Sequence, residues 1–244
     1  CDDGNTLSND ACDATCENTR FIDNEDGTVT DNGPVYIDNP TGMQKMWAKC
    51  SQRAGGNPWN GSGCPASSPP ALFSYCSDNP MECQAYEATD APNESFGVTS
   101  EAYATCAALN ASAFAGYTNW RLPSYEELLT LVTCTGVLSD DEEFPSTEGP
   151  CGGLDESGPF IKPTIDQSIF PDTEDAQYWS TSKAGGQATH AWALGFGLGQ
   201  PTTQALELGK HVRCIRDVEP QYIDNGNGTV SSPDGLMWMQ CTMP

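Results

Sequence analysis

Two short stretches of the chain carry apolar residues at helical spacing. In residues 100–110 the side chains of Ala102, Cys106 and Leu109 fall on one stripe, and Ser100 is a suitable N-cap. We therefore expect an amphipathic helix over this stretch, with the stripe facing the core.

A second helix is expected to begin just after Pro123. Ser124 and Glu127 have the spacing of a capping box, in which each side chain accepts a hydrogen bond from the backbone N–H of the other residue. Leu128 and Leu131 follow at helical spacing, so we expect them to be buried.

Several runs between turn residues have the character of short strands. Residues 178–181, 190–196 and 210–216 are expected to be strands, the last with Val212 and Cys214 on one face and charged side chains on the other. The sequence therefore predicts an α+β fold with two helices, a twisted antiparallel sheet and long loops stapled by disulfides.

A hairpin-sized phrase occurs twice in the chain. Residues 21–31, FIDNEDGTVTD, place Glu-Asp-Gly between two β-prone runs, which predicts a tight turn. The phrase returns in 222–230, YIDNGNGTV, and a Met-Trp-x-x-Cys motif follows each copy, at 46–50 and 237–241. The chain thus contains an internal repeat of one hairpin unit.

The net charge of the chain excludes some classes of binding partner. The chain has 34 acidic and 10 basic residues, and its formal charge is −24. Proteins bind nucleic acid and anionic membrane surfaces by neutralising phosphates with Lys and Arg, so we expect neither as a partner. No apolar run approaches the roughly 20 residues that cross a bilayer, so no transmembrane segment is expected.

Twelve cysteines indicate an oxidising compartment, and the predicted location is extracellular or at the cell surface. Their even number and irregular spacing favour disulfides, and with only two histidines we expect no metal site. A calcium loop in 22–28 fails because Ile22 stands at the first ligand position. Alternatively, Cys1 carries a lipid anchor, which leaves an odd number of cysteines to form disulfides.

Four motifs occur in the order and approximate spacing of a known family. They are the segment 116–127 with its string Trp120-Arg121-Leu122-Pro123, and the segments 26–31, 178–182 and 212–216. This set resembles the Lcl C-terminal domain family of bacterial surface and secreted proteins, over about residues 20–217. The resemblance implies a C-type-lectin-like core, distantly similar to the formylglycine-generating enzymes.

The motif residues have expected roles in the structure rather than in chemistry. Trp120 and Leu122 are expected to anchor a loop in the core, and Pro123 is expected to set the entry to the second helix. Arg121 is expected to bond backbone carbonyls or a carboxylate, and Trp179 is expected in the core.

The lectin-like core implied by the resemblance suggests one disulfide, and closeness in sequence suggests another. In such folds the first helix is commonly tied to the last long strand, which implies a bridge between Cys106 and Cys214. A local bridge between Cys134 and Cys151 is the second expected pair.

We expect no enzyme, no catalytic residue and no cofactor. His190 and His211 lack a neighbouring nucleophile in a recognised setting, and only Cys214 lies where the formylglycine enzymes need a thiol pair. The sugar-binding motifs of calcium-dependent lectins are absent from the sequence. Arg213 and Arg216 are too few to bind a polyanionic glycan against a charge of −24.

Three parts of the chain follow from these patterns: a cross-linked arm over 1–19, the family-like domain over 20–217, and a hairpin over 218–244 that repeats 21–50. An isolated hairpin is only marginally stable in water, so its apolar side chains are expected to be buried against another surface. The hairpin packs either on the chain's own domain or on an adjacent subunit. In the second case it adds a strand to a sheet of that subunit, and this head-to-tail contact repeats from one subunit to the next.

We therefore expect an extracellular structural subunit that assembles into a filament or surface layer. The residues expected in this assembly are the apolar side chains of the hairpin and the terminal cysteines: Tyr222, Ile223, Val230, Met237, Trp238, Cys241, Cys1, Cys12 and Cys16. The alternative function is an adhesin-like module that binds a glycan or a protein of the host or cell surface, with Trp59 and Trp192 as exposed aromatics.

Overall fold

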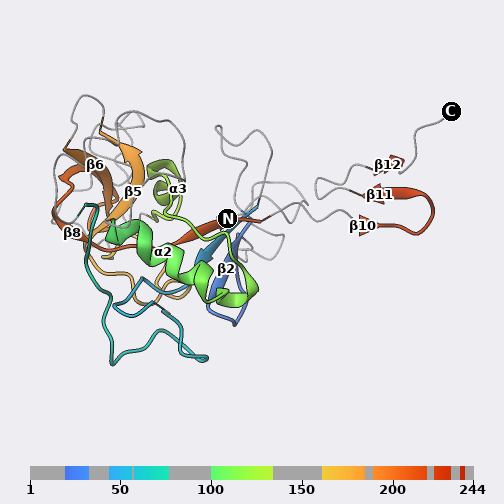
Figure 1. Ribbon diagram of the computed structural model, residues 1–244, viewed down its shortest axis with the longest axis horizontal. Coiled ribbons are helices and arrows are strands. Elements are labelled where there is room, and N and C mark those ends of the chain that lie inside the picture. Colours follow the sequence, from blue (N-terminus) through green and yellow to red (C-terminus); the bar gives the residue numbers. More distant parts are fainter. Residues whose placement is uncertain are drawn as a thin grey trace. The chain divides into compact units, whose positions relative to one another are not determined.

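The computed structural model describes these parts of the chain: residues 20–32, 44–56, 58–76, 100–133, 161–184, 189–218, 223–231 and 237–239. Here the chain combines helices with several small sheets, in agreement with the predicted α+β class (Figure 1). By their contacts the residues form two compact units. One comprises Asp23–Val29 and Trp47–Ile215, and the other comprises Cys1–Ile22, Thr30–Met46 and Arg216–Pro244.

The first sheet has the strand order β1-β2-β3-β9. Its strands are β1 (Phe21–Asp23), β2 (Thr28–Asp31), β3 (Lys45–Ala48) and β9 (Ile215–Asp217). The turn between β1 and β2 is the one that the Glu-Asp-Gly phrase predicts. Gly27 has a φ of 91°, which a residue without a side chain adopts readily.

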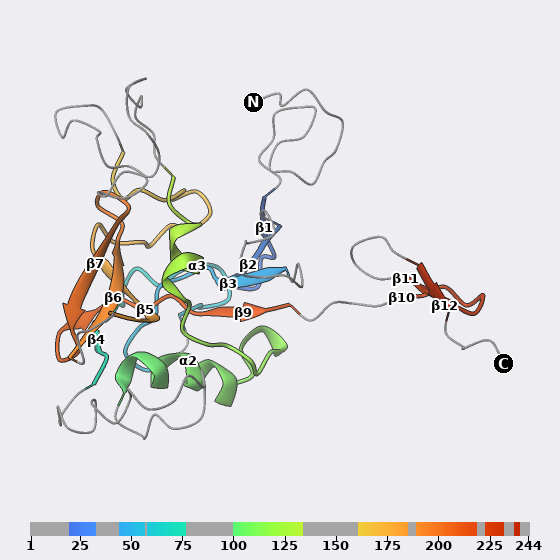
Figure 2. The ribbon, with the colours of Figure 1, turned by 90° about the horizontal axis from the view of Figure 1, so that it is seen from above.

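The second sheet is antiparallel and has the order β5-β6-β7. Its strands are β5 (Gln177–Lys183), β6 (His190–Gly195) and β7 (Gln200–Ala205). Trp179 of β5 pairs with Ala193 of β6, and both residues are fully buried. Helix α3 (Tyr125–Leu129) packs against β5 and β6 (Figure 2).

Two smaller sheets complete the strands of the described residues. β4 (Phe73–Ser74) pairs with β8 (Gly209–Lys210) in an antiparallel ladder of two residues. β10 (Ile223–Asp224), β11 (Thr229–Ser231) and β12 (Met237–Met239) form an antiparallel sheet from the second copy of the repeated phrase.

The first predicted helix is confirmed as α2 (Glu101–Ala111). The hydroxyl of its N-cap, Ser100, accepts a hydrogen bond from the backbone N–H of Tyr103. The predicted stripe is buried, with Ala102, Cys106 and Leu109 all at most 1% exposed. A short 3-10 helix, η2 (Phe114–Gly116), follows.

The second predicted helix is also confirmed, as α3. Both hydrogen bonds of the capping box between Ser124 and Glu127 are present. Leu128 and Leu131 are buried, as their spacing predicts. None of the helices in the described parts of the chain has the length and apolar character needed to cross a membrane.

The single strand expected over 210–216 is wrong. β8 ends at Lys210, β9 begins at Ile215, and the backbone between them bonds two separate parts of the chain, one at Gln177 and one over 48–52. The bonded pairs are His211 N with Gln177 O, Gln52 N with Val212 O, and Ala48 N with Cys214 O. No single neighbouring strand therefore runs along this stretch. The expected contrast between two faces is absent as well, because Val212, Cys214 and Arg213 are all 0% exposed.

Candidate functional site

The Trp120–Pro123 string has the structural role that its residue types predict. The side-chain amide of Asn110 clamps the backbone of Trp120, accepting from its N–H at 2.6 Å and donating to its carbonyl at 2.9 Å. Trp120, Leu122 and Pro123 are buried. The indole N–H of Trp120 donates to a backbone carbonyl of η2 at 3.2 Å. The string therefore anchors the loop that leads into α3.

Arg121 is bound to a carboxylate inside the protein. Its two terminal nitrogens each donate to an oxygen of Glu127 at 2.7 Å, which is a bidentate pair. The backbone of Arg121 also exchanges two hydrogen bonds with Ile215, at 2.8 and 2.9 Å. Trp179 is fully buried and donates from its indole nitrogen to Phe73 O at 2.8 Å. These residues stabilise the fold.

Arg213 and Arg216, the two cations that were judged too few to bind a polyanionic glycan, are buried. Arg216 is 5% exposed and lies beside Met46, with 3.6 Å between a guanidinium nitrogen and the sulfur. Arg213 donates to Thr173 Oγ1 at 2.8 Å and lies 3.4 Å from a carboxylate oxygen of Asp172. Neither cation is placed to meet an anionic ligand, because both are enclosed by protein.

Asp172 is the anionic centre of a buried network. Its carboxylate accepts a hydrogen bond from Arg53 Nη1 at 2.8 Å and from Ser51 N at 3.0 Å, in addition to its contact with Arg213. Ser51 Oγ in turn bonds Tyr178 Oη at 2.9 Å. Burial raises the pKa of the Tyr178 phenol, so this hydroxyl stays neutral in the network.

Two disulfides lie in the described residues with both partners visible. Cys106 in α2 is joined to Cys214, the pair that the family resemblance implies, and Cys50 is joined to Cys64. Cys76 is disulfide-bonded as well. The remaining predicted cysteines lie outside the described residues: Cys134, Cys151, Cys1, Cys12, Cys16 and Cys241.

One group of three potential metal ligands occurs near the network, formed by Cys50, Cys64 and Asp172. Both sulfurs are consumed in the disulfide between the two cysteines. A metal binds thiolates, so this group is a part of the structure rather than a metal site.

The two copies of the repeated hairpin have the same turn. In the first copy, from Asn24 to Thr28, the Asn N–H bonds the Thr carbonyl at 3.1 Å and the Asn side chain bonds the Thr hydroxyl at 2.9 Å. In the second copy, from Asn225 to Thr229, the same two bonds measure 3.0 and 2.9 Å. The middle side chain is Asp in one copy and Asn in the other, and it accepts the Thr hydroxyl at 2.6 Å in both.

The apolar residues of the two copies differ sharply in burial. In the first copy Trp47 and Val29 are 0% exposed. In the second copy Trp238, at the position of Trp47, is 58% exposed, and its neighbours Met237 and Met239 are 64% and 61% exposed. The apolar side chains of the same local structure are therefore buried in the first copy and exposed in the second.

The strand order also differs between the two copies. In the first copy β9 lies beside β3, the strand that carries Trp47. In the described part of the second copy, β12 is the last strand of its sheet. Of the other residues predicted for assembly, Val230 is half-buried, Ile223 belongs to β10, and Tyr222 lies outside the described residues.

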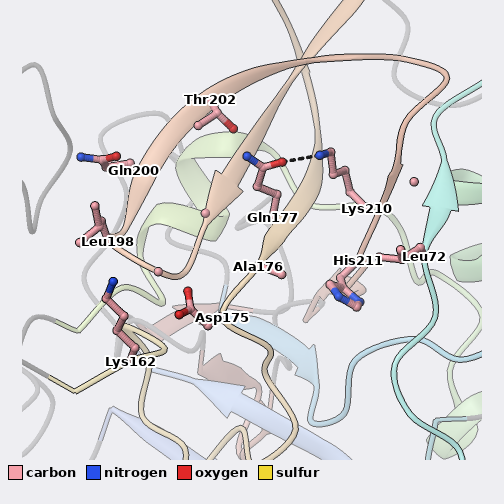
Figure 3. A pocket seen from close by; sticks show the side chains of 13 residues that line it. Leu72, Lys162, Asp175, Ala176, Gln177, Leu198, Gln200, Thr202, Lys210 and His211 are labelled. Carbon is pink, nitrogen blue, oxygen red and sulfur yellow. Dashed lines mark hydrogen bonds between the residues drawn. The ribbon is translucent and has the colours of Figure 1, made fainter.

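A surface cleft of about 490 Å³ is a second candidate site, which the sequence analysis missed. It lies beside β5, β6, β7 and β8, and Figure 3 shows polar side chains gathered around it. These side chains are Lys162, Asp175, Gln177, Gln200, Thr202 and Lys210. The signal that could have found it is the glycine-rich turn over 195–199, because Gly197 allows the side chain of Asp175 to approach the backbone closely. A Cβ there would lie 2.5 Å from an oxygen of Asp175.

The chemistry of this cleft is that of a binding site for polar groups. Lys210 donates from its ammonium to the side-chain carbonyl of Gln177 (Figure 3). Burial lowers the pKa of Lys210 and also that of His211 on the cleft wall. His211 Nδ1 lies 3.1 Å from the carbonyl oxygen of Ala71, so this nitrogen carries the hydrogen.

The aromatics proposed as exposed contacts are half-buried. Trp59 lies against the first hairpin turn, because a Cβ on Gly27 would meet its Cγ at 2.6 Å. Lys49 Nζ lies 5.8 Å from the centre of the same ring. Trp192 packs against Tyr125, with 5.9 Å between the ring centres. Both tryptophans therefore have intramolecular partners.

Comparison with known proteins bears on the family. No curated protein matches this chain significantly. The model of the Lcl C-terminal domain matches residues 35–216, which is most of the chain and contains three of the four motifs on which the resemblance rests, those at 116–127, 178–182 and 212–216. This chain belongs to the Lcl C-terminal domain family.

Proposed function

We propose that this protein is an extracellular structural subunit that assembles head-to-tail, through its hairpin over 222–241, into a filament or surface layer. The observation that carries the proposal is the contrast between the two copies of the hairpin. Both copies have the same turn, but the tryptophan is buried in one and 58% exposed in the other.

The exposed strand β12 supplies a driving force for association. A tryptophan buries about 150–250 Å² when it is fully covered, and each Å² contributes about 25 cal/mol. Covering the exposed 58% of Trp238 therefore contributes about 2–4 kcal/mol. Met237 and Met239 flank it and are similarly exposed, so the same contact covers three large side chains.

The geometry favours an open polymer over a closed pair. A strand on one copy and a different surface on the next make a heterologous contact, which repeats without limit unless the rotation closes a ring. Disulfides are typical of an oxidising extracellular setting, and terminal cysteines are suited to lock such a contact.

The test compares the intact chain with a variant in which the β12 side chains are polar. The triple substitution Met237→Ser, Trp238→Ser and Met239→Ser is expected to turn polymers of the intact chain into monomers. The matched control is Ile161→Ser, which changes a side chain that is 63% exposed outside the hairpin and leaves polymers intact. Sedimentation and electron microscopy measure the outcome. An intact chain that is monomeric at every concentration, or a triple variant that still polymerises, contradicts the proposal.

The cleft favours a second function, an adhesin-like module that binds a glycan or protein of a cell surface. The support is the group of amide, hydroxyl and ammonium side chains around a concave surface of about 490 Å³, on a core that we propose to be lectin-like. The link from α2 to Cys214 is in keeping with such a core. A glycan array probed with the intact chain tests this function.

A further inference from the structure

Two exposed turns in the described parts of the chain share one arrangement around an Asn-Gly pair. The pairs are Asn60-Gly61 and Asn227-Gly228, the latter in the turn between β10 and β11. Both residues of each pair are exposed. An asparagine before a glycine is chemically labile, because the next backbone nitrogen attacks the side-chain amide and glycine has no side chain to shield that nitrogen.

In the hairpin turn, two donors hold the side-chain oxygen of Asn227. Thr229 donates to it from its backbone N–H at 3.1 Å and from its hydroxyl at 2.6 Å. When a nucleophile adds to the amide carbon, negative charge develops on this oxygen, and donors that already point at it stabilise that charge. The turn therefore favours the addition step.

The turn at Asn60 has the same arrangement and a third donor. The side-chain oxygen of Asn60 accepts from Ser62 N at 3.0 Å, from Ser62 Oγ at 3.1 Å and from Gly63 N at 2.9 Å. Two separate turns thus place a hydroxyl and a backbone N–H on the amide oxygen of an asparagine that precedes glycine.

The attacking and the leaving nitrogen are unobstructed in both turns. Within the described parts of the chain, no hydrogen bond engages the backbone N–H of Gly61 or Gly228, or the side-chain NH₂ of the asparagine before it. A Cβ on either glycine would meet no atom within 4 Å. Water therefore reaches both amides.

The neighbouring pair, Asn225-Gly226, is held differently although it is the same dipeptide and is also exposed. The side-chain NH₂ of Asn225 donates to Thr229 Oγ1 at 2.9 Å. That bond must break before the nitrogen can leave as ammonia. In one hairpin, the turn thus holds the leaving nitrogen of Asn225 and the oxygen of Asn227.

We infer that Asn60 and Asn227 are sites of spontaneous deamidation and that both react faster than Asn225. At the hairpin, the nitrogen of Gly228 bonds to the side-chain carbon of Asn227 and loses its proton, the bond to the side-chain nitrogen breaks, and ammonia leaves. Water then opens the resulting succinimide ring at either carbonyl, which yields aspartate or isoaspartate.

The first copy of the hairpin shows that this turn accepts the aspartate product. Asp26 stands at the position of Asn227, and its carboxylate accepts from Thr28 N at 3.0 Å and from Thr28 Oγ1 at 2.6 Å. Aspartate at position 227 therefore keeps the bonds of the turn and adds a negative charge, whereas isoaspartate lengthens the backbone by a methylene group. An aged chain thus differs from a new one in its second hairpin. The reaction does not depend on assembly.

The test compares the two pairs of the hairpin within one molecule. The full chain is incubated in mildly alkaline buffer, folded or in urea, and mass spectrometry of its peptides follows the exchange of NH₂ for OH at each asparagine. In the folded chain Asn227 is expected to react about three- to tenfold faster than Asn225, the range for one hydrogen bond to the developing charge. In urea the two rates are expected to be equal, because both asparagines precede glycine.

Two substitutions remove the hydroxyl donors. Thr229→Val is expected to lower the ratio of the rates at Asn227 and Asn225 toward one, and Ser62→Ala is expected to slow the reaction at Asn60. Thr203→Val, on β7 and outside both turns, is the matched control and leaves all three rates unchanged.

The ratio in the intact folded chain needs no substitution, so it tests the inference even if a variant loosens its turn. Equal rates at Asn225 and Asn227 in the folded chain overturn the inference. An unchanged ratio in Thr229→Val, or an unchanged rate at Asn60 in Ser62→Ala, also overturns it, because the dipeptide alone then sets the rate.

Discussion

The buried charge network predicts a large effect for a single substitution, Asp172→Asn. The carboxylate of Asp172 is the shared counter-ion of Arg53 and Arg213, whose side chains are 4% and 0% exposed. Asparagine has the same shape, but it is uncharged and turns an N–H₂ group toward one of its donors. The substitution therefore leaves two guanidinium groups enclosed by protein without a compensating charge.

The expected loss of unfolding free energy is about 3–5 kcal/mol, the range for removing one partner of a buried ion pair. This estimate applies because the pair is buried and hydrogen-bonded, with 2.8 Å from Arg53 Nη1 to the carboxylate. A surface pair typically contributes 1 kcal/mol or less, so the two situations are easily separated.

Urea unfolding of the oxidised protein, followed by tryptophan fluorescence, measures this free energy. The control is Asp166→Asn, because Asp166 accepts bonds from the backbone and hydroxyl of Ser168 that an asparagine oxygen also accepts. Its expected cost is below about 1 kcal/mol. A loss below about 1 kcal/mol for Asp172→Asn, at an unchanged denaturant slope, refutes the view that Asp172 compensates two buried cations.

Two further predictions concern the hairpin turn and the response to acid. Gly27→Ala is expected to destabilise the protein by about 1–3 kcal/mol in thermal or urea unfolding, because the φ of 91° is strained for alanine and Trp59 blocks the new Cβ. Gly228→Ala, at φ 83° with nothing within 4 Å, is expected to cost less, and equal costs contradict the role of Trp59. Burial lowers the pKa of His211 below 6.5, so the folded state resists a proton that the unfolded chain binds. Stability is therefore retained above pH 6.5 and falls below it. His211→Gln is expected to reduce the fall in Tm between pH 8 and pH 5, and an identical fall in both proteins contradicts this assignment.

Some features follow from residues that are close in sequence. Ser100 and the Ser124–Glu127 pair predict where both helices begin, because a cap satisfies backbone groups within one turn. The Glu-Asp-Gly phrase and its echo predict both hairpins, because the side chains that close each turn belong to the turn itself. The family motifs at 116–127, 178–182 and 212–216 likewise identify the domain from sequence alone.

Other features depend on segments that are distant in sequence. The burial of Arg213 could not be predicted from its neighbours, since its partners are about 40 and 160 residues away along the chain, at Thr173 and Ser51. The cleft likewise could not be predicted from neighbours in sequence, because its walls come from several loops and four strands.

The repeated hairpin shows both kinds of feature, those set by neighbours in sequence and those set by distant segments. The sequence by itself determined that residues 225–229 form the same turn as residues 24–28, since the bonds of a turn are made within it. Only the tertiary structure decided that Trp47 is buried and that Trp238 is exposed. The physical reason is that a strand side chain is buried by whatever packs on the face of its sheet, and the residues of the turn itself do not specify which segments pack there.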